Sequence, residues 1–260
     1  MDERILQIII GESMNKKIII QMPLNTYIGK NKNSENEVNE EWIKYRIMLF
    51  KGYCLKSLEA QSNQNFTALI KCREETIPFI KKEMGELPDN VLIVGVVEYE
   101  QKIKDLIKGY EYLYLVRVDS DDMWKKTFIE WLHNYTPKPE TELLLNQYCY
   151  NYDIYKKRLA SYFLISPQSY VFLYRVDEYL KGKRYRLPGG HQAAITKIHE
   201  LITGVNYMDT LHNTNICSPK FDGYSRHEEW REIKEIEEKR SILEEFGLYG
   251  KEYIHEEKSI

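Results

Sequence analysis

The first half of the chain alternates short apolar runs with amphipathic segments. The apolar runs are rich in Ile, Val, Leu and Tyr and predict buried strands at residues 16–22, 66–70, 91–97 and 112–118. The amphipathic segments place apolar residues near one helical face and predict helices at residues 40–62, 77–84 and 100–108. Strands that alternate with helices are typical of a parallel sheet with helical crossovers, so the pattern predicts an α/β fold with a mainly parallel central sheet.

After residue 122 the pattern changes. A helix is predicted at residues 126–135, and the apolar runs that follow are residues 143–152, 159–165, 170–176 and 205–211. The first three have no long helix between them, which predicts a smaller mixed or antiparallel addition to the sheet. Two further helices are predicted. One covers residues 191–201 after Gly189-Gly190, and the other runs from a capping box at Ser225 to Phe246, where Gly247 stops it.

Composition excludes several classes of protein. The chain has 260 residues, 43% hydrophobic and 30% charged, which is ordinary for a soluble globular protein, and its net charge of −3 gives no electrostatic case for binding nucleic acid. The four cysteines form no CxxC motif, which predicts reduced thiols and a cytoplasmic location. No apolar run approaches the ~20 residues of a transmembrane helix, while peripheral membrane association stays open. The 21 tyrosines would suit a site for a sugar or a nucleobase, but the Lys-, Ile- and Asn-rich composition of the chain accounts better for most of them.

The candidate chemistry lies at the end of the apolar run 112–118, where three acids, Asp119, Asp121 and Asp122, occur within four residues. A strand of this type delivers the residues that follow it to the carboxyl edge of the sheet, where open α/β folds bind ligands. Asp119 and Asp121 are two apart and would point the same way in an extended chain. Carboxylates that converge in this way suit Mg²⁺ or Mn²⁺, with a substrate phosphate completing the shell. The alternative is an acidic turn that caps the next helix.

Four segments together resemble a known family. They are Trp42-Ile-Lys-Tyr-Arg46-Ile-Met-Leu-Phe50, Ser57-Leu-Glu-Ala-Gln61-Ser-Asn-Gln-Asn-Phe66, Arg117-Val-Asp119-Ser-Asp121-Asp122 and His212-Asn-Thr-Asn215. This combination is similar to the putative rhamnosyltransferase family, bacterial glycosyltransferases of the GT-A type, over roughly residues 16–219. The resemblance implies a GT-A-type nucleotide-diphospho-sugar transferase fold in one domain, residues 1–260. Its nucleotide-binding half would be residues 1–122, its acceptor half residues 123–224, and its C-terminal helix and tail residues 225–260.

The resemblance also implies roles for single residues. Mn²⁺ or Mg²⁺ would be held by Asp119, Asp121 and His212, and would bridge the donor's diphosphate. The residues expected to contact the nucleotide sugar are Asn25, Arg46, Arg117, Asp119 and Asp122. Arg117 better suits a structural pair with a neighbour. Arg46 is a candidate contact for the diphosphate, although an arginine on a helix is more often a solvated surface group. The chain departs from the family pattern at Pro23-Leu24 and at Cys72-Arg73, where contacts to the nucleotide base are expected.

An inverting transferase also needs a base for the acceptor hydroxyl, and Asp153, His191 and Asp209 are the candidates. The leading hypothesis is therefore a metal-dependent glycosyltransferase, hexosyltransferase-like and inverting, that uses a nucleotide-sugar donor and a glycan or other hydroxyl acceptor. Two alternatives remain open at this point. One is a catalytically inactive GT-A-like binding module, and the other is a nucleotidyltransferase with the same layout.

Overall fold

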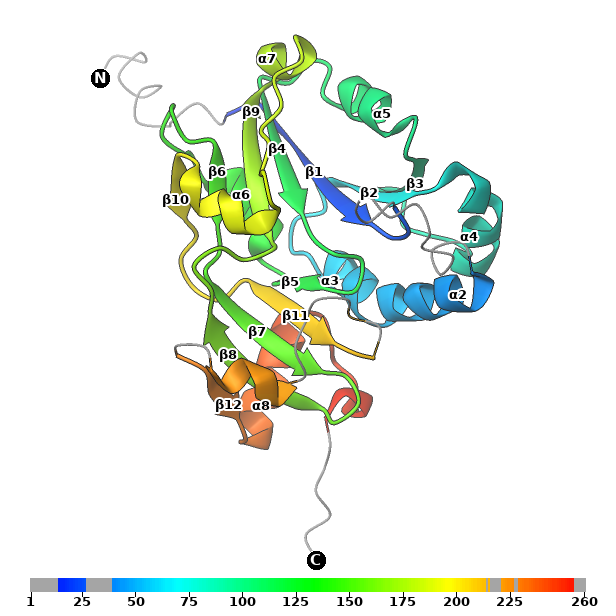
Figure 1. Ribbon diagram of the computed structural model, residues 1–260, viewed down its shortest axis with the longest axis vertical. Coiled ribbons are helices and arrows are strands. Elements are labelled where there is room, and N and C mark those ends of the chain that lie inside the picture. Colours follow the sequence, from blue (N-terminus) through cyan, green and yellow to red (C-terminus); the bar gives the residue numbers. More distant parts are fainter. Residues whose placement is uncertain (1–13, 27–38, 214, 216–220, 227–228, 255–260) are drawn as a thin grey trace, which may run out of the picture.

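The structure is a computed structural model, and it describes residues 14–26, 39–213, 215, 221–226 and 229–254. Two sheets are packed into one body, with the larger sheet and its helices above the smaller sheet in Figure 1. The larger sheet has seven strands in the order β10-β6-β9-β4-β1-β2-β3. The smaller sheet has five strands in the order β12-β8-β7-β11-β5.

Four neighbouring parallel strands, in the order β4-β1-β2-β3, make up one side of the larger sheet, as the sequence predicts. They are β1 (Lys16–Pro23), β2 (Thr67–Cys72), β3 (Val91–Gly95) and β4 (Tyr112–Arg117). The helices that connect them are α2 (Glu40–Leu49), α3 (Leu55–Glu59), α4 (Ile77–Met84) and α5 (Tyr99–Leu106). A π-helical turn, Phe50–Cys54, joins α2 to α3, so the predicted helix 40–62 is one rod with a bulge near its middle.

Alternate residues of each central strand pack into two different cores. Ile18, Ile20 and Met22 face the core that contains Ile43 of α2 and Ile80 of α4. Ile19 faces the opposite core, where α5 and the short helix α7 (Val176–Leu180) pack. A strand that is buried on both faces reads as an unbroken apolar run, which explains why the sequence revealed these strands clearly. The helices therefore cover both faces, and the carboxyl ends of β1, β2 and β4 are left to form a site.

The chain enters the smaller sheet directly after the acids of β4. The short strand β5 (Met123–Trp124) pairs antiparallel with β11 (Tyr207–Leu211), and β11 pairs parallel with β7 (Tyr148–Asp153). The remaining strands are β8 (Arg158–Phe163) and β12 (Arg231–Ile233). This sheet is the mixed addition that the sequence predicts. Its strand β11 lies beside the acidic turn, so it brings residues about 90 positions away in sequence to the end of β4.

The predicted strand 143–152 is wrong, because it is two strands in different sheets. β6 (Leu143–Leu145) belongs to the larger sheet and β7 to the smaller one. Asn146 stands between them, fully buried, and its side-chain amide donates to the carbonyls of Tyr148 and Gly204. These bonds satisfy carbonyls at the point where the chain leaves one sheet for the other. The antiparallel strand β9 (Tyr170–Arg175) then fills the gap between β6 and β4.

Two predicted helices are also wrong, because strand pairing takes over part of each. The segment 191–201 forms a 3-10 helix, His191–Thr196, and then β10 (His199–Leu201), which pairs with β6. The segment 225–246 forms β12 and the shorter helix α8 (Ile236–Glu245). Glu229 has a φ of 59°, which breaks any helix continuing from Ser225, and β12 pairs with β8.

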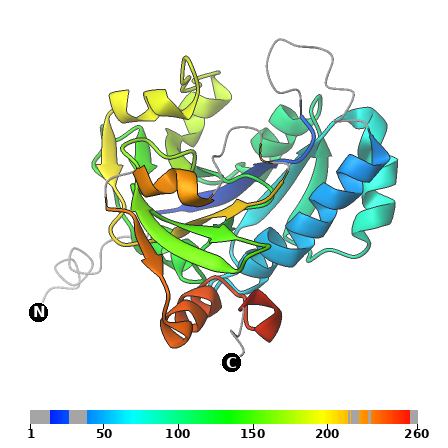
Figure 2. The same cartoon turned by 60° about the horizontal axis from the view of Figure 1, so that its bottom comes forward.

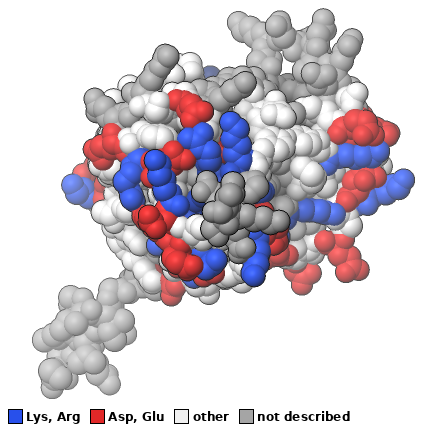
Figure 3. Space-filling model, turned by 90° about the horizontal axis from the view of Figure 1, so that it is seen from below, with Lys and Arg blue, Asp and Glu red and all other residues white. Residues whose placement is uncertain are grey.

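Two further predictions of local structure agree with the described part of the chain. The helix predicted at 126–135 is α6 (Phe128–Asn134), and Gly247 ends α8 with a φ of 82°. Cys54, Cys72 and Cys149 are buried free thiols, whereas Cys217 lies outside the described residues. Within the described ranges, no helix has the length and apolarity to cross a bilayer. Figure 2 brings the side of the molecule with β12 and α8 forward, and in the space-filling view from below basic and acidic side chains are interspersed (Figure 3). Two of the pairs there join Arg158 to Glu232 and Arg231 to Glu238.

Candidate functional site

The three acids after β4 lie in a tight turn. The backbone N–H of Asp122 donates to the carbonyl of Asp119 at 3.0 Å, which closes the turn. The expectation of an extended Asp119-Ser-Asp121 segment, with both side chains pointing the same way, is therefore wrong. The turn sends the three carboxylates to three different sets of partners. Asp121 turns toward α2 and the end of β11, Asp119 turns back toward β4, and Asp122 turns into the smaller sheet.

Asp121 is held by two side chains from distant parts of the chain. Arg46 of α2 donates to both of its carboxylate oxygens, each at 2.8 Å, and His212 Nε2 lies 2.6 Å from Oδ2. The Asp121 side chain is only 6% exposed and that of His212 is fully buried. Burial alone would raise the pKa of Asp121, but the charge of Arg46 and the hydrogen bonds from His212 and Arg46 outweigh it and hold that pKa well below its usual range. Asp121 is therefore an ionised carboxylate in a nearly dry site.

His212 reaches Asp121 because β11 ends beside β4. The side chain of Asn215 accepts from the backbone N–H of His212 at 2.5 Å and so fixes the residues that follow the strand. The ring of Tyr45, from α2, meets the His212 ring edge-on with centroids 6.0 Å apart. The sequence predicts that His212 lies near the acids, and in the structure it contacts Asp121 directly. Its role as a metal ligand stays a prediction.

Asp119 is the most accessible of the three acids, with a side chain 33% exposed. Arg117 donates to it at 2.9 Å and also donates to the carbonyl of Gln168 at 2.6 Å. Burial raises the pKa of Asp119, although the charge of Arg117 opposes the change. Arg117 thus pairs with its neighbour and anchors the loop before β9. The pairing of Arg117 with a neighbour is the structural role expected from the sequence as the alternative to a substrate contact.

Asp122 joins the turn to β11 and does not face the same space as Asp121. It accepts a short hydrogen bond from the Tyr207 hydroxyl and a bond from the backbone N–H of Thr210 at 3.0 Å. Burial, and then the negative charge of Asp209, raise the pKa of Asp122 well above its usual range. Thr210 Oγ1 also donates to the carbonyl of Asp121 at 2.8 Å. This buried network fixes the turn against β11 and so sets where Asp121 meets His212.

The three candidate bases lie in different environments. Asp209, 2% exposed in the middle of β11, accepts from Asn151 and Gln168, each at 3.2 Å. Asp153 accepts from two backbone N–H groups in the turn between β7 and β8. His191 is half-buried, and burial followed by the charge of Arg117 lowers its pKa, while Asp119 acts in the opposite direction. The charges of Arg117 and Asp119 therefore both act on the His191 ring.

Asn25 does not face a ligand space. It is 1% exposed, its side-chain oxygen accepts from the backbone N–H of Arg73 at 3.2 Å, and its amide donates to Thr76 at 2.9 Å. These contacts join the end of β1 to the segment after β2. The expected contact between Asn25 and a nucleotide base is therefore not supported by its position.

Sequence reasoning missed several residues around the site. Ser120 accepts from Arg46 at 2.9 Å, and the hydroxyls of Tyr45 and Tyr155 are 2.6 Å apart beside His212. Tyr155 is 110 residues from Tyr45, in the turn after β7, and Gln168 links Arg117 to Asp209. Each of these contacts joins segments that lie far apart in the sequence and meet only in the folded chain. No local motif could have revealed them.

The donor atoms fit a divalent cation in type. The ionised Asp121 carboxylate suits Mn²⁺ or Mg²⁺, which proteins bind through one or two carboxylates together with substrate phosphates, and the imidazole nitrogen of His212 would be a further ligand for a transition-metal ion such as Mn²⁺. Asp121 Oδ2 and His212 Nε2 are neighbours, so an ion between them would replace the contact that they now make. Asp119 is engaged by Arg117, and among the described residues no three acidic, His or Cys side chains converge on one point. The chain therefore offers two adjacent donors, and the rest of the shell would come from a ligand.

Comparison with known proteins confirms the resemblance seen in the sequence. Residues 29–141 match the model of a family described as putative rhamnosyl transferase. The matched stretch contains Arg46 and the three acids after β4, and it ends before His212. No curated protein matches the chain.

The solved structures that are similar to this chain share little sequence with it. Staphylococcus aureus TarS, residues 1–349, is 15% identical, with a TM-score of 0.39 over 75% of this chain and 60% of that one. The same protein in complex with UDP is 14% identical, with a TM-score of 0.39 over 76% and 61%. A cytidylyltransferase from Leptospira borgpetersenii is 12% identical, with a TM-score of 0.36 over 79% of each chain. The chain thus spans about three fifths of TarS 1–349.

Proposed function

We propose that this protein is a glycosyltransferase that moves a sugar from a nucleotide-diphosphate donor to a hydroxyl group of a glycan or another acceptor. The observation that carries the proposal is the cluster of Arg46, Asp121 and His212 at the carboxyl edge of the larger sheet. Open α/β sheets bind ligands at this edge. The family match over residues 29–141 supports the same class of reaction.

Glycosyl transfer from such a donor leaves a diphosphate that gains negative charge. A divalent cation held by Asp121 and His212 would supply the charge that stabilises this leaving group. Arg46 supplies a second, permanent positive charge at the same place. Its Nε is buried and has no acceptor in the described part of the chain, so not all of its donors are used by Asp121 and Ser120. Asp121 meanwhile keeps the guanidinium plane in one orientation.

His191 is our candidate for the base that takes the proton of the acceptor hydroxyl. It is half-buried near Arg117 and Asp119, and its lowered pKa keeps the imidazole neutral around pH 7. Asp209 is the weaker candidate, because Asn151 and Gln168 occupy its oxygens and it is 2% exposed. Asp209 accepts a hydrogen bond from the Gln168 side chain, and the Gln168 carbonyl accepts one from Arg117, so Asp209 would help to position Arg117.

The test is a thermal-shift screen of nucleoside diphosphates and triphosphates, each with Mn²⁺ and with a chelator. A diphosphate that binds only the native state raises the melting temperature, by mass action, and does so more strongly with Mn²⁺. His212→Ala should remove the metal-dependent part of the shift. Asp105→Asn, which changes an exposed carboxylate of α5, should leave it intact.

Two results would point elsewhere. A shift with triphosphates alone, followed by release of pyrophosphate, would favour a nucleotidyltransferase. If no nucleotide gives a shift, the proposal fails and the inactive binding module is the better account. Arg46 and Arg117 already neutralise Asp121 and Asp119 within the chain, which is the observation that keeps the binding module in view.

A further inference from the structure

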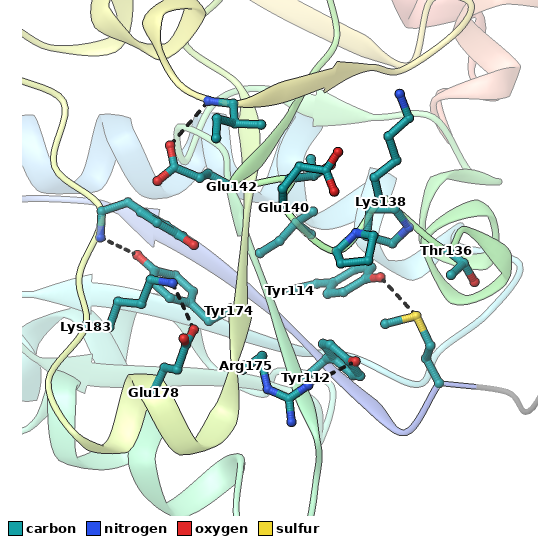
Figure 4. A pocket seen from close by; sticks show the side chains of 17 residues that line it. Tyr112, Tyr114, Thr136, Lys138, Glu140, Glu142, Tyr174, Arg175, Glu178 and Lys183 are labelled. Atoms are coloured by element: carbon teal, nitrogen blue, oxygen red, sulfur yellow. Dashed lines mark hydrogen bonds and ion pairs between the residues drawn. The ribbon is translucent and has the colours of Figure 1, made fainter.

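A cavity of about 490 Å³ lies at the edge of the larger sheet opposite the acidic turn. Tyr112, the first residue of β4, lines it, whereas Asp119 follows the last residue of the same strand. Seven residues of extended chain separate the two, or roughly 20 Å. The walls come from β4, the end of β9, α7 and the loop after it, and the loop after α6 (Figure 4). The cavity is therefore a separate place on the molecule, and its volume is within the usual range of small-molecule sites.

Tyrosine rings form much of the wall. Tyr174 and Tyr185 stack with centroids 4.6 Å apart and an interplanar angle of 23°. The Tyr174 hydroxyl accepts from the backbone N–H of Tyr185 at 3.0 Å, so the second ring is held by the first. Tyr114 donates to the carbonyl of Tyr135 at 3.3 Å from the other side of the cavity. Tyr112 and Tyr185 are half-buried and give the wall its accessible aromatic surface, whereas Tyr114 and Tyr174 are buried with their hydroxyls already in hydrogen bonds.

Charged side chains of both signs surround these rings (Figure 4). Lys183 pairs with Glu178 at 2.8 Å, and the Arg175 guanidinium lies 5.5 Å from the centre of the Tyr112 ring. Within the described residues, the side chains of Lys138 and Glu140 make no hydrogen bond or ion pair. The rim therefore offers both donors and acceptors, and its positive and negative groups alternate instead of forming a patch of one sign.

We infer that this cavity binds a neutral carbohydrate. A sugar ring has C–H faces that pack on aromatic rings, and its hydroxyls both donate and accept hydrogen bonds. A wall of tyrosines with a rim of mixed charge supplies both kinds of contact. An anionic ligand would meet Glu140, Glu142 and Glu178, and an aliphatic chain would bury charged groups without partners. This site goes beyond the proposed function, because it is independent of the donor and of transfer.

The test uses the full chain without any nucleotide. The probes are glucose, galactose, mannose and rhamnose and their oligosaccharides up to tetrasaccharides, with binding measured by saturation-transfer NMR. At least one probe should bind, and Tyr185→Leu and Glu140→Ala should each weaken it, roughly tenfold for the loss of the aromatic face. Tyr249→Leu, which changes an exposed tyrosine outside the cavity, is the matched control and should have no effect.

Asp121→Asn separates this inference from the proposed function. Saccharide binding should survive that substitution even where nucleotide binding is lost. Glu140 is exposed, so Glu140→Ala keeps the test valid if Tyr185→Leu fails to fold. The inference is overturned if no probe binds, if binding is unchanged in Glu140→Ala and in a folded Tyr185→Leu, or if it disappears in Asp121→Asn.

Discussion

The Arg46 guanidinium donates a hydrogen bond to each carboxylate oxygen of Asp121, both at 2.8 Å, although the two residues are 75 positions apart in the sequence. The pair joins α2 to the turn after β4, and both side chains are nearly buried, 11% and 6% exposed. Planar, two-point pairs of this kind fix orientation as well as charge. The contact therefore positions α2 over the site, and it also brings a protein cation to the carboxylate that the metal hypothesis needs.

Replacing one partner of this pair should lower the free energy of unfolding more than the loss of the pair itself would, because it leaves the other partner buried and unpaired. Asp121→Asn leaves the Arg46 charge buried without its main partner, and we expect a loss of about 3 kcal/mol or more in the free energy of unfolding. Arg46→Met should also destabilise the chain, less severely, because His212 still contacts Asp121. In the double variant the two losses should overlap by about 1–3 kcal/mol. Urea unfolding of the four proteins measures this coupling, and strictly additive losses would show that the pair does not act as a unit.

Arg46 should also compete with a divalent cation for Asp121. Arg46→Met removes the internal positive charge, so the carboxylate should attract Mn²⁺ more strongly in the absence of nucleotide. We expect at least a severalfold gain in Mn²⁺ affinity by isothermal titration calorimetry, since each ~1.4 kcal/mol is a tenfold change. Arg240→Met, at a partly exposed arginine that pairs with Glu237, is the control and should bind like the wild type. Equal or weaker binding in Arg46→Met would mean that Asp121 is not a metal ligand.

The sequence predicted the parts of the fold that depend on local pattern. The central strands are apolar on both faces, and the acids mark the end of β4, so both could be placed without a structure. The division between β6 and β7 could not be placed, because polar residues interrupt the run 143–152 at Asn146, Gln147 and Asn151 and nothing in the pattern distinguishes the first of them as a strand end. The helix expected after Ser225 failed for a related reason. Arg231–Ile233 forms a strand only because the edge of β8 is there to pair with it.

For the site, the sequence identified residue types and the structure supplied their partners. The motifs pointed to Arg46, Asp121 and His212, yet they assigned Arg46 to a diphosphate and gave no sign that it would hold Asp121. The family resemblance implied that Asn25 contacts the nucleotide sugar. Its side chain instead bonds to Arg73 and Thr76, two groups that the fold brings beside it. Which neighbour a polar side chain meets depends on tertiary packing, which no local pattern records.

If His191 is the base for transfer, the rate should fall at low pH. Burial and the charge of Arg117 place the pKa of His191 below its ordinary value of 6.5, so the ring gains its proton only below that pH. The acid limb of kcat/KM should therefore lie below pH 6.5, with activity level from there to about pH 8. His191→Asn should lower kcat by roughly 10²–10⁴-fold and remove that limb. An unchanged limb in this variant would transfer the role to Asp209, and Asp209→Asn is the corresponding test.

Lys16 provides a test of stability that does not involve the site. Its ammonium donates to the carbonyls of Leu132, His133 and Tyr135 at 3.1, 3.0 and 2.7 Å, and so caps the C-terminal end of α6. Lys16→Met would remove this donor from all three carbonyls, of which only that of Tyr135 keeps another in the described part of the chain, the Tyr114 hydroxyl, and we expect a loss of about 2–4 kcal/mol in the free energy of unfolding at pH 7. Lys181→Met, at an exposed lysine of the loop after α7, is the matched control and should change stability little.

The same lysine gives the pH dependence a definite sign. Burial lowers the pKa of Lys16 in the folded chain to about 8, from 10.5 for an ordinary lysine. Between these values the unfolded chain holds the proton that the folded chain has released, so the stability due to Lys16 rises with pH, by at most about 1.4 kcal/mol per pH unit. Below pH 8 both states are protonated and the slope vanishes. The stability gap between wild type and Lys16→Met should therefore widen from pH 8 to pH 9.5 in urea titrations. A gap that stays constant over this range would show that the three carbonyl bonds hold the proton at least as strongly as burial weakens it, because both states would then remain protonated.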